Sequence, residues 1–467
     1  MNSVPAELHS SSQAARWAPS NARFSLASMG IACGLLGLAA AHPFALTAVI
    51  VGLAGYALLG SKQAVQALSL MVLIKYLNPA LCDFPPLSGI LFWGMTYAAC
   101  LSFLIRLKPA NLLAAVPVAY FYLVVLTLSF WSSQPLISIL KATSFCGVVA
   151  CLLIGYQGMD QKDTEGLGRW FFSLAAALFV ASLPTLPFAD IAFHRNGKSF
   201  QGILNHPQAF GIFWPPFILW FAFDWLFQPS ERSRNVETLF LAGMLAMVIA
   251  SRARTGMAAI LLGSCATLVL LFCSKNLRRR TVLKRGLAAA LAMGICVVAA
   301  VAAIPSVQEG VKAYLYKGED ARSVKEAFHQ SRGRIIGRQW KNFLKSPWTG
   351  NGFGVYAEGF FPSGVKTFAG IPISASVEKG VTPTAVLEEI GVIGTVALLV
   401  FLIFLTKPLL SPGCAPWVAM FMGCLAVNFG EAIFFSLGGN GLFYWLLMGW
   451  CRAAARMAGR EPHWSTF

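Results

Sequence analysis

Long apolar segments follow one another along most of this chain, and one long polar and basic segment, residues 306–382, interrupts them. A helix that crosses the hydrocarbon core of a bilayer needs about 20 apolar residues, and continuous runs of this length are typical of membrane spans. The pattern predicts fourteen spans, or twelve if the short segments 44–60 and 237–251 are re-entrant or broken. The runs are continuous rather than alternating, so the sequence does not fit a membrane β-barrel.

The predicted spans divide the chain into one membrane domain with an inserted loop. They cover residues 26–42, 44–60, 64–80, 88–105, 111–129, 136–156, 169–187, 208–227, 237–251, 256–274, 286–304, 383–406, 413–429 and 437–450. We therefore expect the all-α class, a polytopic membrane helix bundle of 12–14 spans with one large, partly helical loop. The parts are a tail at 1–25, an N-terminal transmembrane bundle at 26–305, the loop at 306–382, C-terminal transmembrane helices at 383–450 and a tail at 451–467.

Composition and charge indicate the sidedness of these spans. Of the 467 residues, 57% are hydrophobic and only 12% are charged, whereas a soluble domain is about 25% charged. The formal net charge of +17 would suggest nucleic acid in a soluble protein, but here much of it is a topology signal, and we expect no nucleic-acid partner. Lys and Arg residues crowd segment 275–285, which the positive-inside rule places in the cytoplasm. Counting from it puts both termini inside and the loop 306–382 outside, with segments 190–207 and 251–255.

The outer loop contains a basic amphipathic segment. A helix is predicted from about Ser331 to the residue before Pro347, and its apolar face carries Ile336, Trp340, Phe343 and Leu344. Its basic stripe is formed by Arg334, Arg338, Lys341 and Lys345. Such a helix fits a membrane surface with anionic headgroups, or a solvated face whose apolar side packs on the domain. The glycines of 350–354 then make a tight turn, which is only weak evidence for a phosphate cradle.

Arginines and one histidine gather on the predicted outer side. Arg195 precedes the segment Asn205-His206-Pro207, and Arg252 and Arg254 flank a break between two spans. The loop adds Arg332, Arg334 and Arg338. Guanidinium groups bind phosphate oxygens through paired hydrogen bonds and keep their charge, so these arginines suit a diphosphate. An arginine at a membrane boundary can also simply snorkel, and His206 can be a helix-end or packing residue.

Carboxylates are sparse on the outer side. Glu378 lies at the end of the loop, Glu388 and Glu389 open the next span, and Glu431 lies in or near a late span. Glutamates in the first helical turn are favoured by the helix dipole, and an isolated carboxylate at membrane depth is either a site or the partner of an arginine. There is no DxD, HExxH or Cys/His metal spacing, and the eleven cysteines are scattered, so we expect neither a metal nor a cofactor.

The order of these parts resembles the O-antigen ligase and O-antigen polymerase superfamily, bacterial inner-membrane proteins with many spans and one large periplasmic loop. The likeness covers roughly residues 190–450. It is carried by Arg195-x-Gly197 before Asn205-His206-Pro207, Ser251-Arg252 at a span start, Arg332 or Arg334 opening the loop helix, Pro347-x-x-Gly350-x-Gly352-x-Gly354, and Glu389-x-Gly391-x-x-Gly394. Each motif is short, but their order and consistent sidedness are fairly specific.

The resemblance implies a transferase that acts in the periplasm on a glycan linked to undecaprenyl diphosphate, without metal or nucleotide. An acceptor hydroxyl would attack the anomeric carbon with inversion while the lipid diphosphate leaves. Arg195 and Arg252 would stabilise that leaving group. Substrate binding would fall to Arg254, Arg332, Arg334, Arg338, Gly350 and Gly352. Many members carry a His-Asn pair that begins eleven residues before the glycine corresponding to Gly391, but this chain has Gly380-Val381 there. Either Glu378, Glu389 or His206 would then be the base, or the acceptor would need little help from a base.

Two classes of function remain open. The favoured one is an inner-membrane enzyme that polymerises a lipid-linked oligosaccharide, slightly ahead of a ligase that transfers it to lipid A–core or to protein. The acceptor would then be a glycan, lipid A–core or protein. The rival is a flippase for lipid-linked oligosaccharide, which would place charges along a central cavity and often shows internal repeats. A non-enzymatic membrane scaffold is a third possibility.

Overall fold

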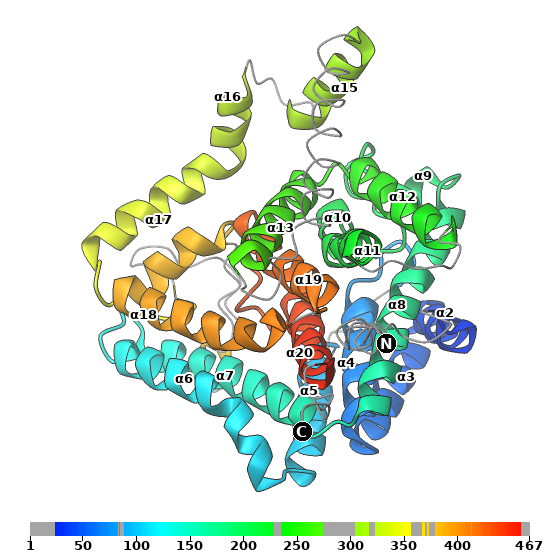
Figure 1. Ribbon diagram of the computed structural model, residues 1–467. Coiled ribbons are helices and arrows are strands. Elements are labelled where there is room, and N and C mark those ends of the chain that lie inside the picture. The colour runs from blue at the N-terminus through cyan, green and yellow to red at the C-terminus, as the bar shows by residue number, and fades with distance from the viewer. Residues whose placement is uncertain are drawn as a thin grey trace, which may run out of the picture.

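The apolar segments fold as α-helices wherever the structure, a computed structural model, describes them (Figure 1). It describes residues 24–82, 84, 88–227, 235–273, 304–316, 323–355, 367–368, 371–372, 379–411 and 413–458. The predicted all-α membrane bundle is confirmed. Of the predicted spans, 286–304 lies outside the described residues except for Ile304.

The first half of the chain supplies the helices of one side of the bundle. They are α2 (Leu26–Ala41), α3 (Pro43–Leu58), α4 (Ser61–Lys75), α5 (Ser88–Ile105), the 3-10 helix η2 (Pro109–Ala115), α6 (Val116–Ser129), α7 (Pro135–Gln157), α8 (Gln161–Ser182), η3 (Leu183–Thr185) and α9 (Ala189–Ala192).

The second half supplies the remaining spans and the loop helices. They are α10 (Pro207–Phe213), α11 (Pro215–Phe227), α12 (Asn235–Ala250), α13 (Arg254–Cys273), α15 (Pro305–Tyr316), α16 (Val324–Phe328), the π-helical turn η5 (His329–Gly333), α17 (Arg334–Lys345), α18 (Thr382–Thr406), η6 (Lys407–Leu410), α19 (Ala415–Ala426), η7 (Val427–Phe429) and α20 (Asn440–Ala458). One antiparallel pair, β1 (Thr367–Phe368) and β2 (Ile371–Pro372), completes the described elements.

Seven helical segments of the described chain are long and apolar enough to cross a membrane, and four shorter apolar helices accompany them. The segments 44–60 and 237–251, which were candidates for broken or re-entrant spans, fold as the unbroken helices α3 and α12 of 16 residues each. At 1.5 Å per residue such a helix is about 24 Å long, which is shorter than the ~30 Å hydrocarbon core. The segment 208–227 is instead divided into α10 and α11, where Pro215 and Pro216 follow Trp214.

Helix α20 lies at the centre of the bundle and is buried along most of its length. Aromatic side chains join it to three other helices through their polar tips. The bonds run from Tyr156 Oη to Leu446 O, from Tyr444 Oη to Ile212 O, and from Trp450 Nε1 to Thr164 O, at 2.7, 2.7 and 2.9 Å. A buried aromatic ring contributes apolar area and its hydroxyl or indole N–H still requires a partner, so these contacts fix the positions of α7, α8 and α10 around α20.

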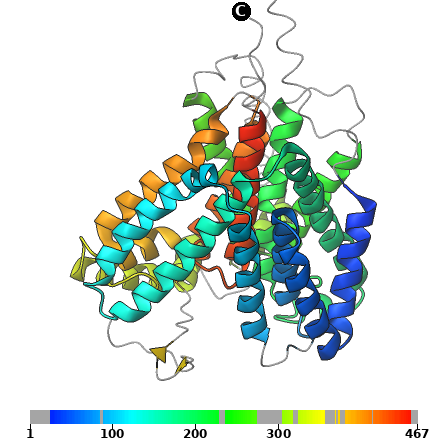
Figure 2. The same ribbon diagram turned by 90° about the horizontal axis from the view of Figure 1, so that it is seen from below.

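Connections from distant parts of the sequence meet at one end of the bundle. We call this end, which includes Tyr76, Ser132, Asn205 and Asn351, the loop face. Asn205 N–H donates to Tyr76 O at 2.7 Å, and Ser132 Oγ donates to Asn351 O at 2.8 Å. Figure 2 shows β1 and β2 beyond this end, while the red C-terminal end of α20 points the other way. The opposite face is joined by different contacts, including Lys62 with Asp163 at 3.8 Å. The grouping of the loops therefore agrees with the sidedness that the sequence predicts.

The helix of the outer loop begins earlier than predicted. Ser323 caps α16 by accepting a hydrogen bond from Glu326 N–H at 3.2 Å, and the helix continues through a π-helical turn into α17. The serine–x–x–glutamate spacing is a capping-box signature, which the basic stripe further along the sequence obscured. The helix ends at Lys345, so the predicted stop before Pro347 is confirmed.

Candidate functional site

The π-helical turn of the loop directs Arg332 toward the bundle, where it meets a carboxylate. Arg332 Nη2 lies 2.5 Å from Glu431 Oε1, and the two side chains are only 19% and 14% exposed. Gln208 Nε2 donates to the same oxygen at 2.7 Å and also contacts Thr255 Oγ1 at 2.9 Å. A π-turn adds one residue to a helical turn and is frequent at functional sites, because it redirects the side chains that follow.

The backbone of Glu431 is held as firmly as its side chain. Thr382, the first residue of α18, donates from Oγ1 to Glu431 O at 2.9 Å, and its hydroxyl also lies 3.2 Å from Asn428 Oδ1. We call Gln208, Thr255, Arg332, Thr382 and Glu431 the central cluster. Its members come from three separate helices, one π-turn and the connection before α20, so only the assembled bundle creates it.

The end of α4 borders this cluster. Lys75 Nζ donates to Gly438 O, and Tyr76 Oη accepts from Asn440 N–H at 3.1 Å. Both contacts fix the segment between Glu431 and the start of α20. The residues that follow Tyr76 pair with the segment before α10, because Asn78 N–H donates to Ile203 O at 2.8 Å and Leu77 forms a β-bridge with Leu204.

Arg195 and Arg252 lie on neighbouring segments of the loop face. Arg195 is exposed, and its backbone N–H donates to Gln201 Oε1 at 2.9 Å. Phe200 N–H donates to Ala250 O at 3.0 Å, which holds this loop against the turn that contains Arg252. Arg252 has φ +50°, a left-handed conformation that costs a non-glycine residue about 1–2 kcal/mol. Such strain is typical of residues whose side-chain direction matters.

Arg254 begins α13 beside Thr255 of the central cluster. On its other side it faces the loop helix α15, where Tyr314 is partly buried. Burial raises the pKa of Tyr314 to about 12, against a smaller opposing effect of the positive charge of Arg254. The first residue of α13 thus joins the central cluster to α15.

Arg334 and Arg338 point away from Arg332. They line a groove of about 490 Å³ on the outward face of α17, with Lys341 and Lys345. Arg332 and the buried Gln339 instead face α18 and the segment before it. Residues two positions apart on a helix point about 200° away from each other. Arg332 and Arg334 therefore cannot line the same pocket. The structure therefore separates the predicted group of loop arginines into an inward and an outward set.

His206 caps α10 and is exposed. Its Nδ1 accepts a hydrogen bond from Gln208 N–H at 3.0 Å, so the neutral ring carries its proton on Nε2. In this arrangement the exposed ring nitrogen is a donor rather than a proton acceptor. His206 is thus suited to bind an oxygen atom, while its use as a base would require the cap to break.

Glu388 and Glu389 are buried around Lys379. Lys379 Nζ lies 2.9 Å from Glu388 Oε2 and 3.4 Å from Glu389 Oε1, and the three side chains are 5–8% exposed. The second oxygen of Glu389 accepts from Gly354 N–H at 2.7 Å. Burial by itself lowers the pKa of Lys379, but the charges of Glu389 and Glu388 outweigh it, so that the pKa is raised. The predicted base Glu389 therefore lies in a closed ion-pair cluster, and Glu378 lies outside the described residues.

The glycine turn that follows α17 fits into a break in α18. Gly391 has φ +60° and ψ −166°, a conformation open almost only to glycine, and the helix is interrupted there. Asn351 N–H and Gly352 N–H donate to Glu388 O and Glu389 O, both at 2.9 Å. A Cβ on Gly350 would lie 2.4 Å from Glu389 O. Gly350 and Gly352 thus bring two backbones together, and their N–H groups are used within the protein.

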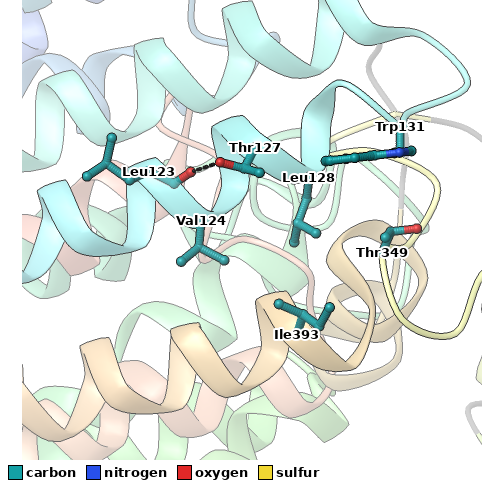
Figure 3. Close-up of a pocket in the computed structure, with 7 residues that line it drawn as sticks. All are labelled: Leu123, Val124, Thr127, Leu128, Trp131, Thr349 and Ile393. Atoms are coloured by element: carbon teal, nitrogen blue, oxygen red, sulfur yellow. Dashed lines mark hydrogen bonds between the residues drawn. The ribbon is translucent and has the colours of Figure 1, made fainter.

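An apolar groove opens beside this junction (Figure 3). It has a volume of about 470 Å³ and lies between α6 and α18, near Trp131 and Thr349 of the loop face. The residues that line it are Leu123, Val124, Thr127, Leu128, Trp131, Thr349 and Ile393. The hydroxyl of Thr127 donates back to Leu123 O at 2.8 Å, so the groove presents almost only carbon atoms.

The sequence alone missed three members of the central cluster. Gln208, Thr255 and Thr382 carry no motif of their own, since each is an ordinary polar residue in the first turn of a helix. The available signal was Glu431, a carboxylate near a late span for which an arginine partner was one of the two readings. Arg332 is that partner.

The architecture and this site define a multi-pass helical membrane protein with arginine-bearing segments and a buried arginine–glutamate pair at one face. Residues 239–376 match the family model described as O-Antigen ligase, which confirms the resemblance to the O-antigen ligase and polymerase superfamily over this part of the chain. The matched segment includes Arg252, Arg254 and the loop helix, whereas Arg195, His206 and Glu431 lie outside it. No curated protein matches the chain.

Proposed function

We propose that this protein transfers a glycan from undecaprenyl diphosphate to an acceptor hydroxyl, as an inverting glycosyltransferase at the periplasmic face of the bacterial inner membrane. Polymerisation of lipid-linked oligosaccharide is the favoured form of the reaction, and ligation to lipid A–core or protein is the alternative. Both termini then lie in the cytoplasm. No metal is assigned a role, because guanidinium groups supply the positive charge that a leaving diphosphate requires.

The observation that carries the proposal is the convergence of Arg195, Arg252, Arg254 and Arg332 on one face of the bundle. The segments of the first three are joined by the bond from Phe200 to Ala250 and by the short turn 251–253, and Arg332 enters from the loop. Several guanidinium groups next to a bilayer fit a lipid diphosphate, which carries its charge at the membrane surface.

The chemistry assigned to these residues is charge stabilisation at the leaving group. As the bond between the anomeric carbon and the diphosphate oxygen lengthens, negative charge builds on that oxygen. Fixed cations placed there lower the barrier, and removal of one such group typically costs about 10²–10³-fold in rate. Arg252 is held by its strained turn, and Arg332 by the π-helical turn. Nε2–H of His206 is a further donor at the same face.

The groove between α6 and α18 is assigned to the isoprenoid chain of a lipid substrate. Its lining is apolar, it is open toward the lipid, and it ends near the loop face at Trp131 and Thr349. An isoprenoid chain in this groove keeps its apolar surface out of water, while its diphosphate remains at the membrane boundary. The basic groove of α17 lies close by, because Lys345 lines the basic groove and Thr349, four positions later, lines the apolar one.

One assay tests the function and separates its forms. Purified protein in a bilayer is incubated with lipid-linked oligosaccharide, alone or with lipid A–core or an acceptor protein. Longer lipid-linked chains indicate a polymerase, and a glycosylated acceptor indicates a ligase. Absence of product with every acceptor, together with movement of the lipid across the bilayer, would contradict the proposal and favour transport.

A further inference from the structure

Glycosyl transfer requires a group that accepts the proton of the attacking hydroxyl, and the two predicted bases among the described residues, Glu389 and His206, are poorly placed for it. Both oxygens of Glu389 are engaged, by Lys379 and by Gly354 N–H, inside a buried cluster. His206 uses Nδ1 to cap α10 and presents a donor on Nε2. A base must carry a lone pair within reach of the substrate, so neither residue qualifies in this arrangement.

Glu431 differs from these residues in place and in partner. Its side chain is 14% exposed and lies at the loop face beside Arg332, one of the diphosphate-binding candidates. Arg332 and Gln208 both bind the same oxygen, Oε1. Arg332, the ion-pair partner of Glu431, lies on the π-turn of the loop rather than on a membrane span. Glu388 and Glu389 are instead buried around Lys379, where the glycine turn packs against α18.

We propose that Glu431 is the general base of this enzyme and that Arg332 restrains it until a lipid diphosphate binds. The inference rests on the proposed glycosyl transfer. A diphosphate at the loop face competes with Glu431 for Arg332, because a guanidinium pairs equally well with phosphate and with carboxylate. When Arg332 turns to the diphosphate, the carboxylate loses its adjacent positive charge and becomes a better proton acceptor.

In the proposed transfer step, Glu431 accepts the proton and Arg332 stabilises the leaving group. The acceptor oxygen forms a bond to the anomeric carbon, and the bond from that carbon to the diphosphate oxygen breaks. The lipid diphosphate leaves with the bonding electron pair and is stabilised by Arg332 with Arg195 and Arg252. The hydroxyl proton passes to the carboxylate of Glu431 and then to water. Gln208 and Thr382 keep the carboxylate and its backbone in place during the exchange.

Such an exchange links the availability of the base to the presence of the donor. While Arg332 pairs with the carboxylate at 2.5 Å, its positive charge makes Glu431 a weaker proton acceptor. Arg332 lies in the π-helical turn, and such turns are frequent at functional sites, which is consistent with this role.

The test compares Glu431→Gln with Glu431→Asp in the full-length protein in nanodiscs. For Glu431→Gln we expect transfer to fall about 10²–10⁴-fold, with binding of a lipid-linked oligosaccharide donor changed only a few-fold. Glu431→Asp should recover part of the rate. The acidic limb of the pH–rate profile should shift in Glu431→Asp and disappear from the residual activity of Glu431→Gln. Glu431→Gln with more than half of the wild-type rate and an unchanged profile would overturn the inference.

A charge-swapped variant separates this role from a structural ion pair. Arg332→Glu combined with Glu431→Arg restores an ion pair between the same two positions but moves the carboxylate to the loop. Recovery of both stability and full transfer would overturn the proposal, whereas recovered stability without transfer supports it. If the wild-type protein makes no product from any lipid-linked donor, the proposed function itself has failed, and that result is distinct from an active wild type with an active Glu431→Gln variant.

Discussion

At the scale of single residues, the loop face separates exposed charges, to which we assign substrate binding, from buried charges that hold the fold. Arg195 is exposed and Arg252 half-exposed on adjacent segments, while Lys379 is almost completely buried between two carboxylates. A half-exposed arginine next to a bilayer is available to a ligand, and a buried lysine with two carboxylates is not. The two kinds of residue should therefore respond differently to mutation.

Arg195→Ala and Arg252→Ala are each expected to reduce glycan transfer about 10²-fold or more, because each removes a fixed positive charge from the leaving diphosphate. Expression and thermal stability should change little, since neither side chain is buried. The matched control is Lys162→Ala, an exposed cation at the opposite face, which should retain full activity. Transfer rates measured in nanodiscs test this prediction. Full activity of both arginine variants would contradict the assignment of Arg195 and Arg252 to the leaving diphosphate.

Lys379→Met is expected to destabilise the contact between the loop and α18 by about 3–5 kcal/mol, because it leaves Glu388 and Glu389 buried without a counter-charge. The melting temperature of the purified protein measures this effect. The triple variant Lys379→Met, Glu388→Gln, Glu389→Gln should regain part of the loss, since no unpaired charge remains.

The pKa of Lys379 is raised above its ordinary value of 10.5, so its stabilising contribution is complete below that pH and is lost only as the pH rises through the higher folded-state value. A wild-type melting temperature that rises at strongly alkaline pH would contradict this assignment.

At the scale of elements, the break in α18 and the two faces of α17 organise the loop. The break exposes the carbonyl groups of Glu388 and Glu389 to the glycine turn, and Val392 N–H donates in return to Pro347 O at 2.9 Å. The loop is therefore fixed to a span by main-chain hydrogen bonds rather than resting on it. Helix α17 presents Gln339 and Phe343 to the protein and its basic stripe to the outside.

Gly391→Ala is expected to destabilise the protein by at least about 2 kcal/mol, through the disfavoured conformation and through close contact. A Cβ at this position would lie 2.4 Å from Trp348 O. Gly337→Ala is the control, because nothing lies within 4 Å of its Cβ position in the middle of α17. Alanine is favoured over glycine in a helix by about 0.5–1 kcal/mol, so this variant should be neutral or slightly more stable. Equal melting temperatures for both variants would show that the break in α18 does not require glycine.

The outward side of α17 is expected to lie at the bilayer surface. Trp340, Leu344 and Trp348 are 48%, 59% and 65% exposed along one edge of the basic stripe, and tryptophan and basic residues both favour the membrane interface. A photoreactive amino acid at position 344 should cross-link to phospholipid, and one at position 309 of α15, which is also exposed, serves as the comparison. Replacement of Arg334, Arg338 and Lys341 by Gln should reduce cross-linking to anionic lipid more than to neutral lipid. The same yield with both lipids before and after replacement would contradict an electrostatic contact.

At the scale of the whole molecule, the arginine-bearing segments of the proposed site lie at one end of the described bundle. Their connections meet at the loop face, while Lys62, Asp163 and Lys162 lie at the other end of the bundle. In the proposed reaction, a lipid-linked substrate would reach the site laterally along the groove between α6 and α18. A site on one face is consistent with a transferase, whereas a transporter would require charges along the depth of the membrane.

Cysteine labelling tests this sidedness in intact cells. In a background without native cysteines, Lys198→Cys should react with a membrane-impermeant maleimide added from the periplasmic side, because it lies exposed in the loop before α10. Lys162→Cys, exposed at the opposite face, should react only after permeabilisation. Labelling in the reverse order would place the arginines in the cytoplasm and contradict a periplasmic reaction.

The sequence by itself determined the class of fold, the resemblance to the superfamily and the end of the loop helix. These properties depend on local features, namely apolar length, charge bias and short motifs, which are present in the linear chain. The tertiary structure decided which polar residues meet. Arg332 and Glu431 are 99 positions apart, and the inward direction of Arg332 depends on a π-turn that no residue pattern announces. Glu389 and Glu431 are both carboxylates near span ends. Their difference appears only in the structure, where Lys379 and Gly354 N–H bind Glu389 inside a buried cluster. Side-chain roles at a membrane face are set by partners from other helices, and these partners become neighbours only when the bundle assembles.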